Sequence, residues 1–134
     1  KLAFGSIVNQ GLPFYGGCVP YRFGVDCPGG DIRLTVPRYD GALTEIFGDG
    51  VHAGEIIFPP YELELKELSA GRHEIEVKLY TNRRNAFGTV HLYDKKCHCI
   101  GPDAWRTSGC QWSYEYVLRN VGVESAPVIY SLKK

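Results

Sequence analysis

The feature that most constrains the fold is an alternation of apolar and polar residues between Ala42 and Tyr93. Leu63 and Leu65 alternate with glutamates, and the run from His73 to Tyr80 alternates in the same way. Successive side chains of a β-strand point to opposite faces, so each run predicts a strand with one dry and one wet face. The stretch therefore predicts antiparallel strands that pack as two sheets face to face.

Turn signals predict where these strands end. Asp49-Gly50 lies between two apolar runs and suits a tight hairpin, because Gly adopts positive φ freely. Pro28-Gly29-Gly30 predicts a second hairpin, and Glu67 to Arg72 predicts a polar turn. Pro59-Pro60 cannot donate ladder hydrogen bonds, so we expect the chain to leave the sheet there and to expose Tyr61 near an edge.

The second half of the chain carries weaker signals. Phe87–Tyr93, Trp112–Leu118 and Pro127–Leu132 predict further strands, Val121–Val123 predicts a short connection, and no stretch predicts a helix. Asp94 to Gln111 shows no alternation and is longer than most connections in compact domains, which makes it a candidate binding loop. The chain thus predicts an all-β fold, a single two-sheet antiparallel β-sandwich over residues 1–134.

Size and charge bound the function. A chain of 134 residues with 44% hydrophobic content suffices for one domain. Lys plus Arg and Asp plus Glu number 15 each, so no basic field is available to gather nucleic acid. No window approaches the roughly 18 consecutive apolar residues of a membrane span. We expect no nucleic acid and no membrane as partner, and, because the sequence has no initiating Met, a fragment of a larger protein.

The cysteines bear on metals and on location. The chain has five: Cys18, Cys27, Cys97, Cys99 and Cys110. Their spacing fits no common zinc or redox motif, and the odd number argues against a full disulfide framework. In Cys97-His98-Cys99 the two thiols would lie on one side of a strand and the imidazole on the other, which disfavours a zinc site. Reduced structural thiols are expected instead, which favours a cytoplasmic location.

Several stretches follow one another in an order that is typical of a known module: Phe47–Gly54, Pro59–Leu65, Leu68–Val77, Asn82–His91, Cys99–Arg106 and Trp112–Tyr116. Together they resemble the galactose-binding-like jelly roll, the sugar-binding-type module that accompanies the catalytic domain in glycoside hydrolases of family two and related glycosidases. The resemblance implies a jelly-roll β-sandwich and a non-catalytic accessory module, at the C-terminus of a bacterial glycoside hydrolase. Its implied partner is the catalytic domain of the parent chain.

Loop residues supply a candidate carbohydrate site. Aromatic faces cover the C–H side of a sugar ring, and planar amide or guanidinium groups meet its hydroxyls. The residues of these types are Tyr61, Asn82, Arg83, Arg84, Asn85, His91, Trp105, Arg106 and Trp112. The same types also tie loops to backbone carbonyls or plug the end of a sandwich. A purely structural module for domain contacts or oligomerisation, without a sugar site, is therefore the alternative.

Catalysis and cofactors are disfavoured. A glycosidase needs two carboxyl groups about 5 to 10 Å apart across one cleft, with one of them kept protonated. The candidate carboxylates form no paired motif: Glu45, Glu55, Glu62, Glu64, Asp103 and Glu115. We expect no catalytic residue in this chain and no cofactor. Asp26, Asp31 or Asp40 on turns could hold a structural calcium ion, although no spaced Asp motif assigns its ligands.

Overall fold

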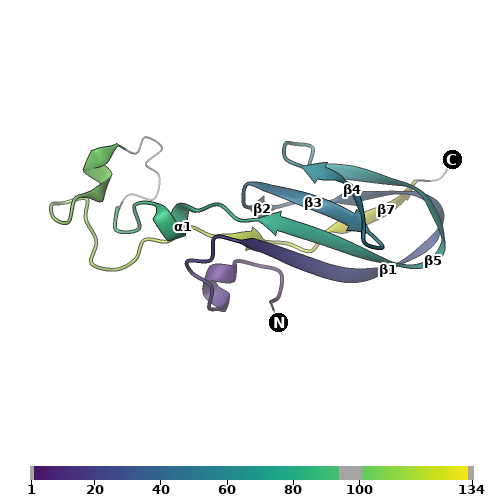
Figure 1. Cartoon of the computed structure of the whole chain (residues 1–134), viewed down its shortest axis with the longest axis horizontal. Helices are drawn as coiled ribbons and strands as arrows, with labels where there is room; N and C mark the ends of the chain where they lie inside the picture. The colour runs from purple at the N-terminus through teal and green to yellow at the C-terminus, as the bar shows by residue number, and fades with distance from the viewer. Residues whose placement is uncertain (1, 94–100, 133–134) are drawn as a thin grey trace.

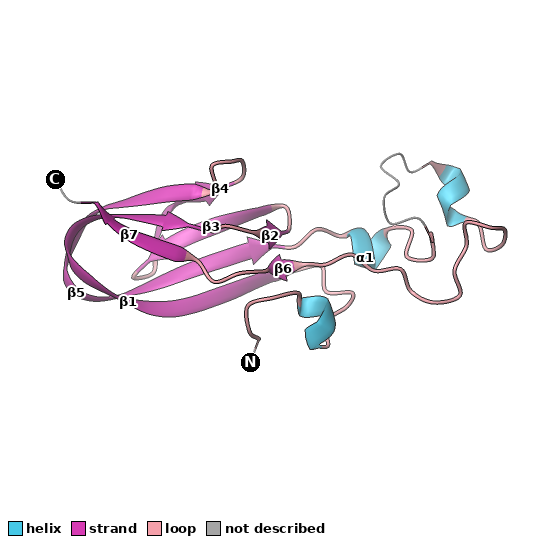
Figure 2. Ribbon diagram, turned by 180° about the vertical axis from the view of Figure 1, so that it is seen from behind, coloured by secondary structure: helices cyan, strands magenta, loops and turns pink. Residues whose placement is uncertain are grey.

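The structure is a computed structural model that describes residues 2–93 and 101–132, and most of its regular structure is β-strand. The strands form a five-stranded antiparallel sheet of order β4-β3-β5-β1-β7 and a two-stranded sheet of order β2-β6. The predicted all-β, two-sheet antiparallel architecture is confirmed. Figures 1 and 2 show an elongated body of strands, with the chain between β5 and β6 reaching away from one end of it.

The elements follow in chain order: η1 (Ile7–Gln10), β1 (Cys18–Thr35), β2 (Tyr39–Asp40), β3 (Leu43–Gly48), β4 (Val51–Ile56), β5 (Glu62–Tyr80), α1 (Arg84–Phe87), η2 (Pro102–Trp105), β6 (Gly122–Val123) and β7 (Val128–Leu132). β1 and β5 pair along almost their whole lengths, from Cys18 opposite Tyr80 to Thr35 opposite Glu62. β3 joins the last part of β5, whereas β7 joins the last part of β1. This long ribbon is the frame on which the shorter strands assemble.

Two of the predicted turns are wrong, because they lie inside these long strands. Pro28-Gly29-Gly30 belongs to β1, and Glu67–Arg72 belongs to β5. The turn residues still shape the backbone there: Gly29 and Gly30 have φ of 96° and 102°, and Glu67 has φ of 56°. Residues that permit a turn therefore bend a paired ribbon, because strand pairing continues through them.

A β-bulge marks this bend. Gly30 and Ile32 of β1 lie opposite Leu68 and Leu65 of β5, so β5 carries one extra residue. The Oδ1 atom of Asp31 accepts a hydrogen bond from the backbone N–H of Glu67 at 2.9 Å. An extra residue in one strand increases the local twist and bends the pair, and this hydrogen bond satisfies a donor that the ladder leaves free.

The Asp49-Gly50 hairpin is confirmed. β3 and β4 pair antiparallel on either side of it, and both turn residues have positive φ, 49° and 80°. The chain also leaves the sheet at Pro59-Pro60, as predicted. The expected exposure of Tyr61 is wrong, because its half-buried ring packs on the core and edge-on against Tyr39, with centroids 5.3 Å apart.

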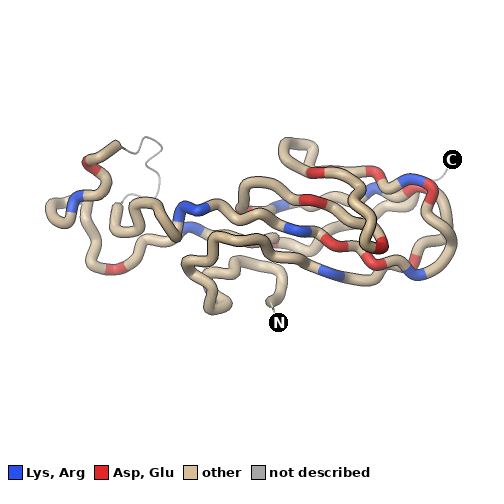
Figure 3. The backbone as a smooth tube through the Cα atoms, in the orientation of Figure 1, with Lys and Arg blue, Asp and Glu red and all other residues tan. Residues whose placement is uncertain are grey.

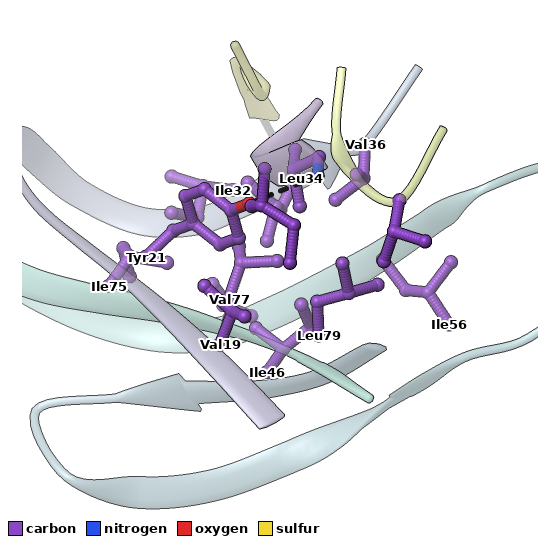
Figure 4. Close-up of a cluster of buried hydrophobic side chains, with 14 of the residues drawn as sticks. Val19, Tyr21, Ile32, Leu34, Val36, Ile46, Ile56, Ile75, Val77 and Leu79 are labelled. Carbon is purple, nitrogen blue, oxygen red and sulfur yellow. Dashed lines mark hydrogen bonds between the residues drawn. The ribbon is translucent and has the colours of Figure 1, made fainter. Parts of the chain in front are cut away.

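The core gathers side chains from the long strands and their neighbours. The side chains in Figure 4 point toward one another between the strands: Val19, Tyr21, Ile32, Leu34, Val36, Ile46, Ile56, Ile75, Val77 and Leu79. Ile75, Val77 and Leu79 are fully buried, and the polar residues between them face outward, as the alternation predicts. Burying such a side chain contributes about 1.5–3 kcal/mol. The Tyr21 hydroxyl accepts a hydrogen bond from the Val123 N–H at 3.2 Å, which ties β6 to this core.

The strand predictions for the second half are wrong except at its end. Phe87–Tyr93 and Trp112–Leu118 form no strand and meet in a single bridge between Leu92 and Trp112. The short helix α1 occupies a region for which no helix was expected. Val121–Val123 is a buried segment that contains β6, instead of a plain connection. β7 confirms the predicted closing strand.

Candidate functional site

The chain between β5 and β6 forms an extension, defined as residues 82–93 and 101–120. It reaches away from the strand body, defined as residues 18–80 and 121–132 (Figures 1 and 2). All predicted site residues except Tyr61 lie in the extension. Since Tyr61 packs in the strand body against Tyr39, the structure does not bring it together with the others.

The asparagines of the extension hold its backbone. Asn85 is 4% exposed, donates from Nδ2 to the Arg119 carbonyl at 2.8 Å and accepts at Oδ1 from the Arg119 N–H at 3.0 Å. Asn82 Oδ1 accepts from the Arg84 N–H at 3.1 Å. A buried amide that bonds both backbone groups of one residue acts like a neighbouring strand. Asn85 therefore ties the start of the extension to its end.

The two adjacent arginines flank the beginning of α1. Arg83 is exposed, and its carbonyl accepts from the Phe87 N–H at 2.9 Å. Arg84 is half-buried, and its carbonyl accepts from the Gly88 N–H at 2.8 Å. Their backbone groups thus close the single turn of α1. Neither residue lines the cavity that holds other predicted site residues.

Five rings form a continuous aromatic row: Phe14, Tyr116, His91, Trp112 and Tyr114. In that order, successive ring centroids lie 5.0, 5.0, 5.5 and 4.2 Å apart. Nδ1 of His91 lies 2.8 Å from the Ser113 carbonyl oxygen, and because a carbonyl only accepts, Nδ1 carries the proton. Aromatic pairs at such distances contribute about 0.5–1.5 kcal/mol beyond burial. The row is therefore a connected structure rather than a set of separate side chains.

A cavity of about 390 Å³ lies beside this row. His91, Arg106 and Trp112 line it, so the structure brings together three of the predicted site residues. Nη2 of Arg106 donates to Oδ1 of Asp103 at 2.6 Å, and both residues line the cavity. The Arg106 guanidinium at the cavity is therefore paired with a carboxylate. Trp105 ends η2 beside this wall and is 57% exposed, outside the cavity lining.

A second cavity of about 390 Å³ was not anticipated from the sequence as a site. It lies where the extension meets the strand body, and its lining includes Asp40, Asn82 and Arg119. Burial, together with a hydrogen bond to Glu124, raises the pKa of the Asp40 carboxyl. Arg38 pairs with Glu124 at 2.5 Å. No local pattern could reveal this pair, because Asp40 and Glu124 are far apart in the sequence and meet only through the pairing of β2 with β6.

Glu45 and Glu64, two of the carboxylates considered for catalysis, lie in unsuitable settings, and so does the pair Asp40 and Glu124, which the sequence did not single out for catalysis. The carboxyls of Asp40 and Glu124 are joined by a hydrogen bond. In a glycosidase, the two catalytic carboxyl groups stand about 5 Å or more apart, so that the glycosidic bond fits between them. A hydrogen bond from the Tyr80 hydroxyl at 2.8 Å is the main cause that lowers the pKa of Glu45, the opposite of what a general acid requires. Glu64 pairs with Arg33 on a strand surface at 2.9 Å.

The expected calcium ligands have other partners or are exposed. Asp31 accepts from the Glu67 N–H, Asp40 bonds to Glu124, and Asp26 is exposed on β1. Within residues 2–93 and 101–132, no group of three or more His, Cys, Asp or Glu side chains is arranged to hold a metal ion. Cys97-His98-Cys99 lies outside the described residues. The sequence assigned no ligands to a structural calcium ion, and the contacts of these aspartates assign none either. In the described part of the chain, no helix has the length and apolar character of a membrane span.

No protein-family model matches the sequence, and comparison with curated proteins gives no match. Among solved structures, the chain is similar to a rhamnosidase from Novosphingobium sp. PP1Y, with a TM-score of 0.58 and 18% identity. That likeness covers 87% of this chain and 11% of the rhamnosidase chain. The chain has the fold of a small part of a glycoside hydrolase.

A GH2 beta-galacturonidase from Eisenbergiella tayi gives a similar result. Its structures bound to glycerol and to galacturonate match with TM-scores of 0.60 and 0.58 and 20% identity. The likeness covers 96% of this chain in both cases, and 19% and 20% of the two beta-galacturonidase chains. At these identities the likeness shows a shared fold, and most of each enzyme lies outside the shared region.

Proposed function

We propose that the chain is a non-catalytic accessory module of a glycoside hydrolase, of the galactose-binding-like jelly-roll type, and that it works beside the catalytic domain of its parent chain. The observation that carries this proposal is the coverage: at least 87% of this chain matches only 11–20% of each glycosidase chain. The sequence stretches that resemble the galactose-binding-like module support the same proposal. The bacterial parent and the C-terminal position that they imply are part of the proposal.

The residue chemistry supports a role without catalysis. The Asp40 and Glu124 carboxyls contact each other, and Glu45 is held in its ionised form. Cys18, Cys27 and Cys110 are free thiols, which suits the reducing cytoplasm. On this proposal the module positions or supports a neighbouring domain, and cleavage of the glycoside belongs to that domain.

Carbohydrate contact at the 390 Å³ cavity beside the aromatic row is the second candidate function. It is favoured by one observation, that His91, Arg106 and Trp112 line the same cavity. An indole face and a guanidinium are groups that meet the C–H side and the hydroxyls of a sugar. Asn85 lies outside this candidate site, because the Arg119 backbone already occupies its amide.

Turnover assays test the first proposal. The purified chain is incubated with aryl glycosides of rhamnose, galactose and galacturonic acid, and no release of the aglycone is expected. The full-length parent enzyme, obtained by sequencing outward from Lys1, is expected to cleave at least one of them. Turnover by the isolated chain that disappears in the Asp40→Asn variant would show instead that the chain is an enzyme.

A titration tests the second candidate. Rhamnose, galactose and galacturonate are added to millimolar concentration while the indole N–H signals of Trp105 and Trp112 are followed by NMR. Contact in the cavity shifts the Trp112 signal, and Arg106→Ala abolishes that shift. Exposed Arg83, outside the cavity lining, provides the matched control, since Arg83→Ala leaves the shift in place. Unchanged spectra at all sugar concentrations would remove the sugar site.

A further inference from the structure

The extension exposes several large aromatic side chains close together in the sequence. Tyr114 is 89% exposed, Phe87 75%, Tyr93 72% and Tyr116 60%. A patch of this kind on a soluble protein marks a surface that contacts another molecule. Tyr114 and Tyr116 belong to the aromatic row, so part of this surface is contiguous.

The backbone beneath the aromatic row is fixed before any partner arrives. The Tyr93 N–H donates to the Gln111 carbonyl at 2.8 Å, and the Ser113 N–H donates to the His91 carbonyl at 2.8 Å. The Val117 N–H donates to the Val90 carbonyl. These bonds link the two arms of the extension on either side of the Leu92–Trp112 bridge. A preformed surface loses little conformational entropy on binding, which favours affinity.

The row is also connected to the rest of the molecule. The Phe14 ring, from the segment before β1, packs edge-on against Tyr116 with centroids 5.0 Å apart. At the base of the extension, Asn85 bonds both backbone groups of Arg119. The aromatic row is thus held by the segment before β1 and by the base of the extension. A partner bound to it is therefore positioned relative to the strand body.

The charge pattern indicates what kind of surface fits. Lys, Arg, Asp and Glu are interspersed along the strand body, whereas long parts of the extension carry none (Figure 3). Between Phe87 and Tyr93 no residue is charged, and Glu115 is the single charge between Trp112 and Val117. Tyr and Trp with few charges are the composition of the energetically dominant centre of protein interfaces.

The ring geometry favours a protein over a glycan here. The His91 ring contacts Trp112 at 5.5 Å and Tyr116 at 5.0 Å, and Tyr114 stands edge-on to Trp112 at 4.2 Å. The interplanar angles of 25°, 37° and 79° make the row uneven, whereas a row of sugars needs a flat platform. The rings present their edges and the Tyr hydroxyls, which suit an uneven, mostly uncharged protein surface.

We propose that the aromatic row is a docking surface whose occupant is the catalytic domain of the parent chain. This inference rests on the proposed function. The choice of occupant follows from the coverage: the solved glycosidases carry a part with this fold within chains five or more times longer, since the shared region is 11–20% of each. A neighbouring domain is then always present at high effective concentration, which a weak preformed surface can use.

The proposal is tested by measuring the binding between the isolated module and the rest of the parent enzyme. The parent enzyme without this module is titrated calorimetrically with the isolated chain, and the Tyr114→Ser/Tyr116→Ser variant is compared with the unchanged chain. We expect at least a tenfold loss of affinity in the variant. The variant loses the ring contacts with Phe14, His91 and Trp112, so the thermal unfolding of both chains is measured first and binding is compared below both transitions. Tyr130→Ser on β7 is the matched control, because Tyr130 is also exposed, at 55%, and lies on the strand body. This control should bind like the unchanged chain.

Each other outcome overturns the proposal. Equal affinity of the tyrosine variant and the control would mean that the row is not the interface. Sedimentation that shows a dimer of the isolated chain, lost in the variant, would make a second copy the occupant. A sugar titration that perturbs Tyr114 and Tyr116 would make it a glycan surface. Turnover by the full-length parent is measured separately, so failure of the glycosidase assignment is distinguishable from failure of the docking surface.

Discussion

The strand body and the extension are held together in different ways. In the strand body, residues such as Leu34 and Ile75 are fully buried, and polar residues between them face water. In the extension, Tyr114 and Phe87 are mostly exposed, and the chain is held by polar tethers such as the amide of Asn85. The difference teaches that the strand body is stabilised by its own core, whereas the extension is held by hydrogen bonds and leaves large aromatic side chains exposed.

Removing core volume is the strongest test of this contrast. Leu34→Ala is expected to lower the free energy of unfolding by about 2–5 kcal/mol, because Leu34 is 0% exposed and the cavity left behind cannot fully collapse. The control is Val51→Ala on β4, where the side chain is 70% exposed and the change should stay within about 0.5 kcal/mol. Urea denaturation measures both. Similar values for the two variants would contradict the assigned core.

The extension should respond to loss of a tether without loss of the strand body. Asn85→Ala removes the side-chain amide that bonds the Arg119 N–H and carbonyl, and loss of these two hydrogen bonds costs about 1–3 kcal/mol. Hydrogen exchange should therefore speed up at Arg119 and remain unchanged in β1 and β5. Asn120→Ala is the control, since Asn120 is exposed and bonds only the Glu124 side chain among the described residues. Exchange that accelerates throughout β5 would mean that the two regions unfold together.

The two regions also differ in how far the sequence predicts them. The faces of β5 were predictable because side-chain alternation is a local property of a strand. Its bend was not, since Gly29-Gly30 and Glu67 permit a turn and only the partner strand decides that pairing continues. In the extension, the alternation of Trp112 to Leu118 suggested a strand, but it meets its neighbour at one bridge only.

The candidate site shows the same limit. His91, Arg106 and Trp112 could be proposed together from residue chemistry, and they line one cavity. The amide of Asn85 looked equally suited to a sugar, yet it is satisfied by backbone groups that lie far along the chain. Which polar side chains remain available depends on long-range contacts. Residue type alone cannot separate a tether from a ligand group.

The smallest effect on stability is expected from a polar contact within the strand body, in which His73 bonds Asp49 and Ser69. Its contribution changes with pH, which distinguishes it from the apolar core. Nδ1 of His73 lies 2.6 Å from Oδ2 of Asp49, and Nε2 lies 2.9 Å from the Ser69 carbonyl. Both partners only accept, so both ring nitrogens carry protons and the imidazole is charged. The hydrogen bond to Asp49, followed by the bond to Ser69, raises the pKa of His73 above its ordinary 6.5. The same bond to His73 is the main cause that lowers the pKa of Asp49 below 3.8.

These directions set the sign of the pH dependence. The contribution of His73 to stability is fully present below pH 6.5 and is lost as the pH rises through its raised pKa. The contribution of Asp49 is present above pH 3.8 and is lost as the pH falls through its lowered pKa. The contact is therefore strongest between about pH 4 and 6.5. Asp49→Asn should flatten the dependence of the unfolding midpoint on pH, whereas Asp26→Asn, at an exposed residue of β1, should preserve it. If the histidine titration followed by NMR keeps its raised midpoint in Asp49→Asn, the hydrogen bond between His73 and Asp49 does not contribute to the pH dependence of the strand body.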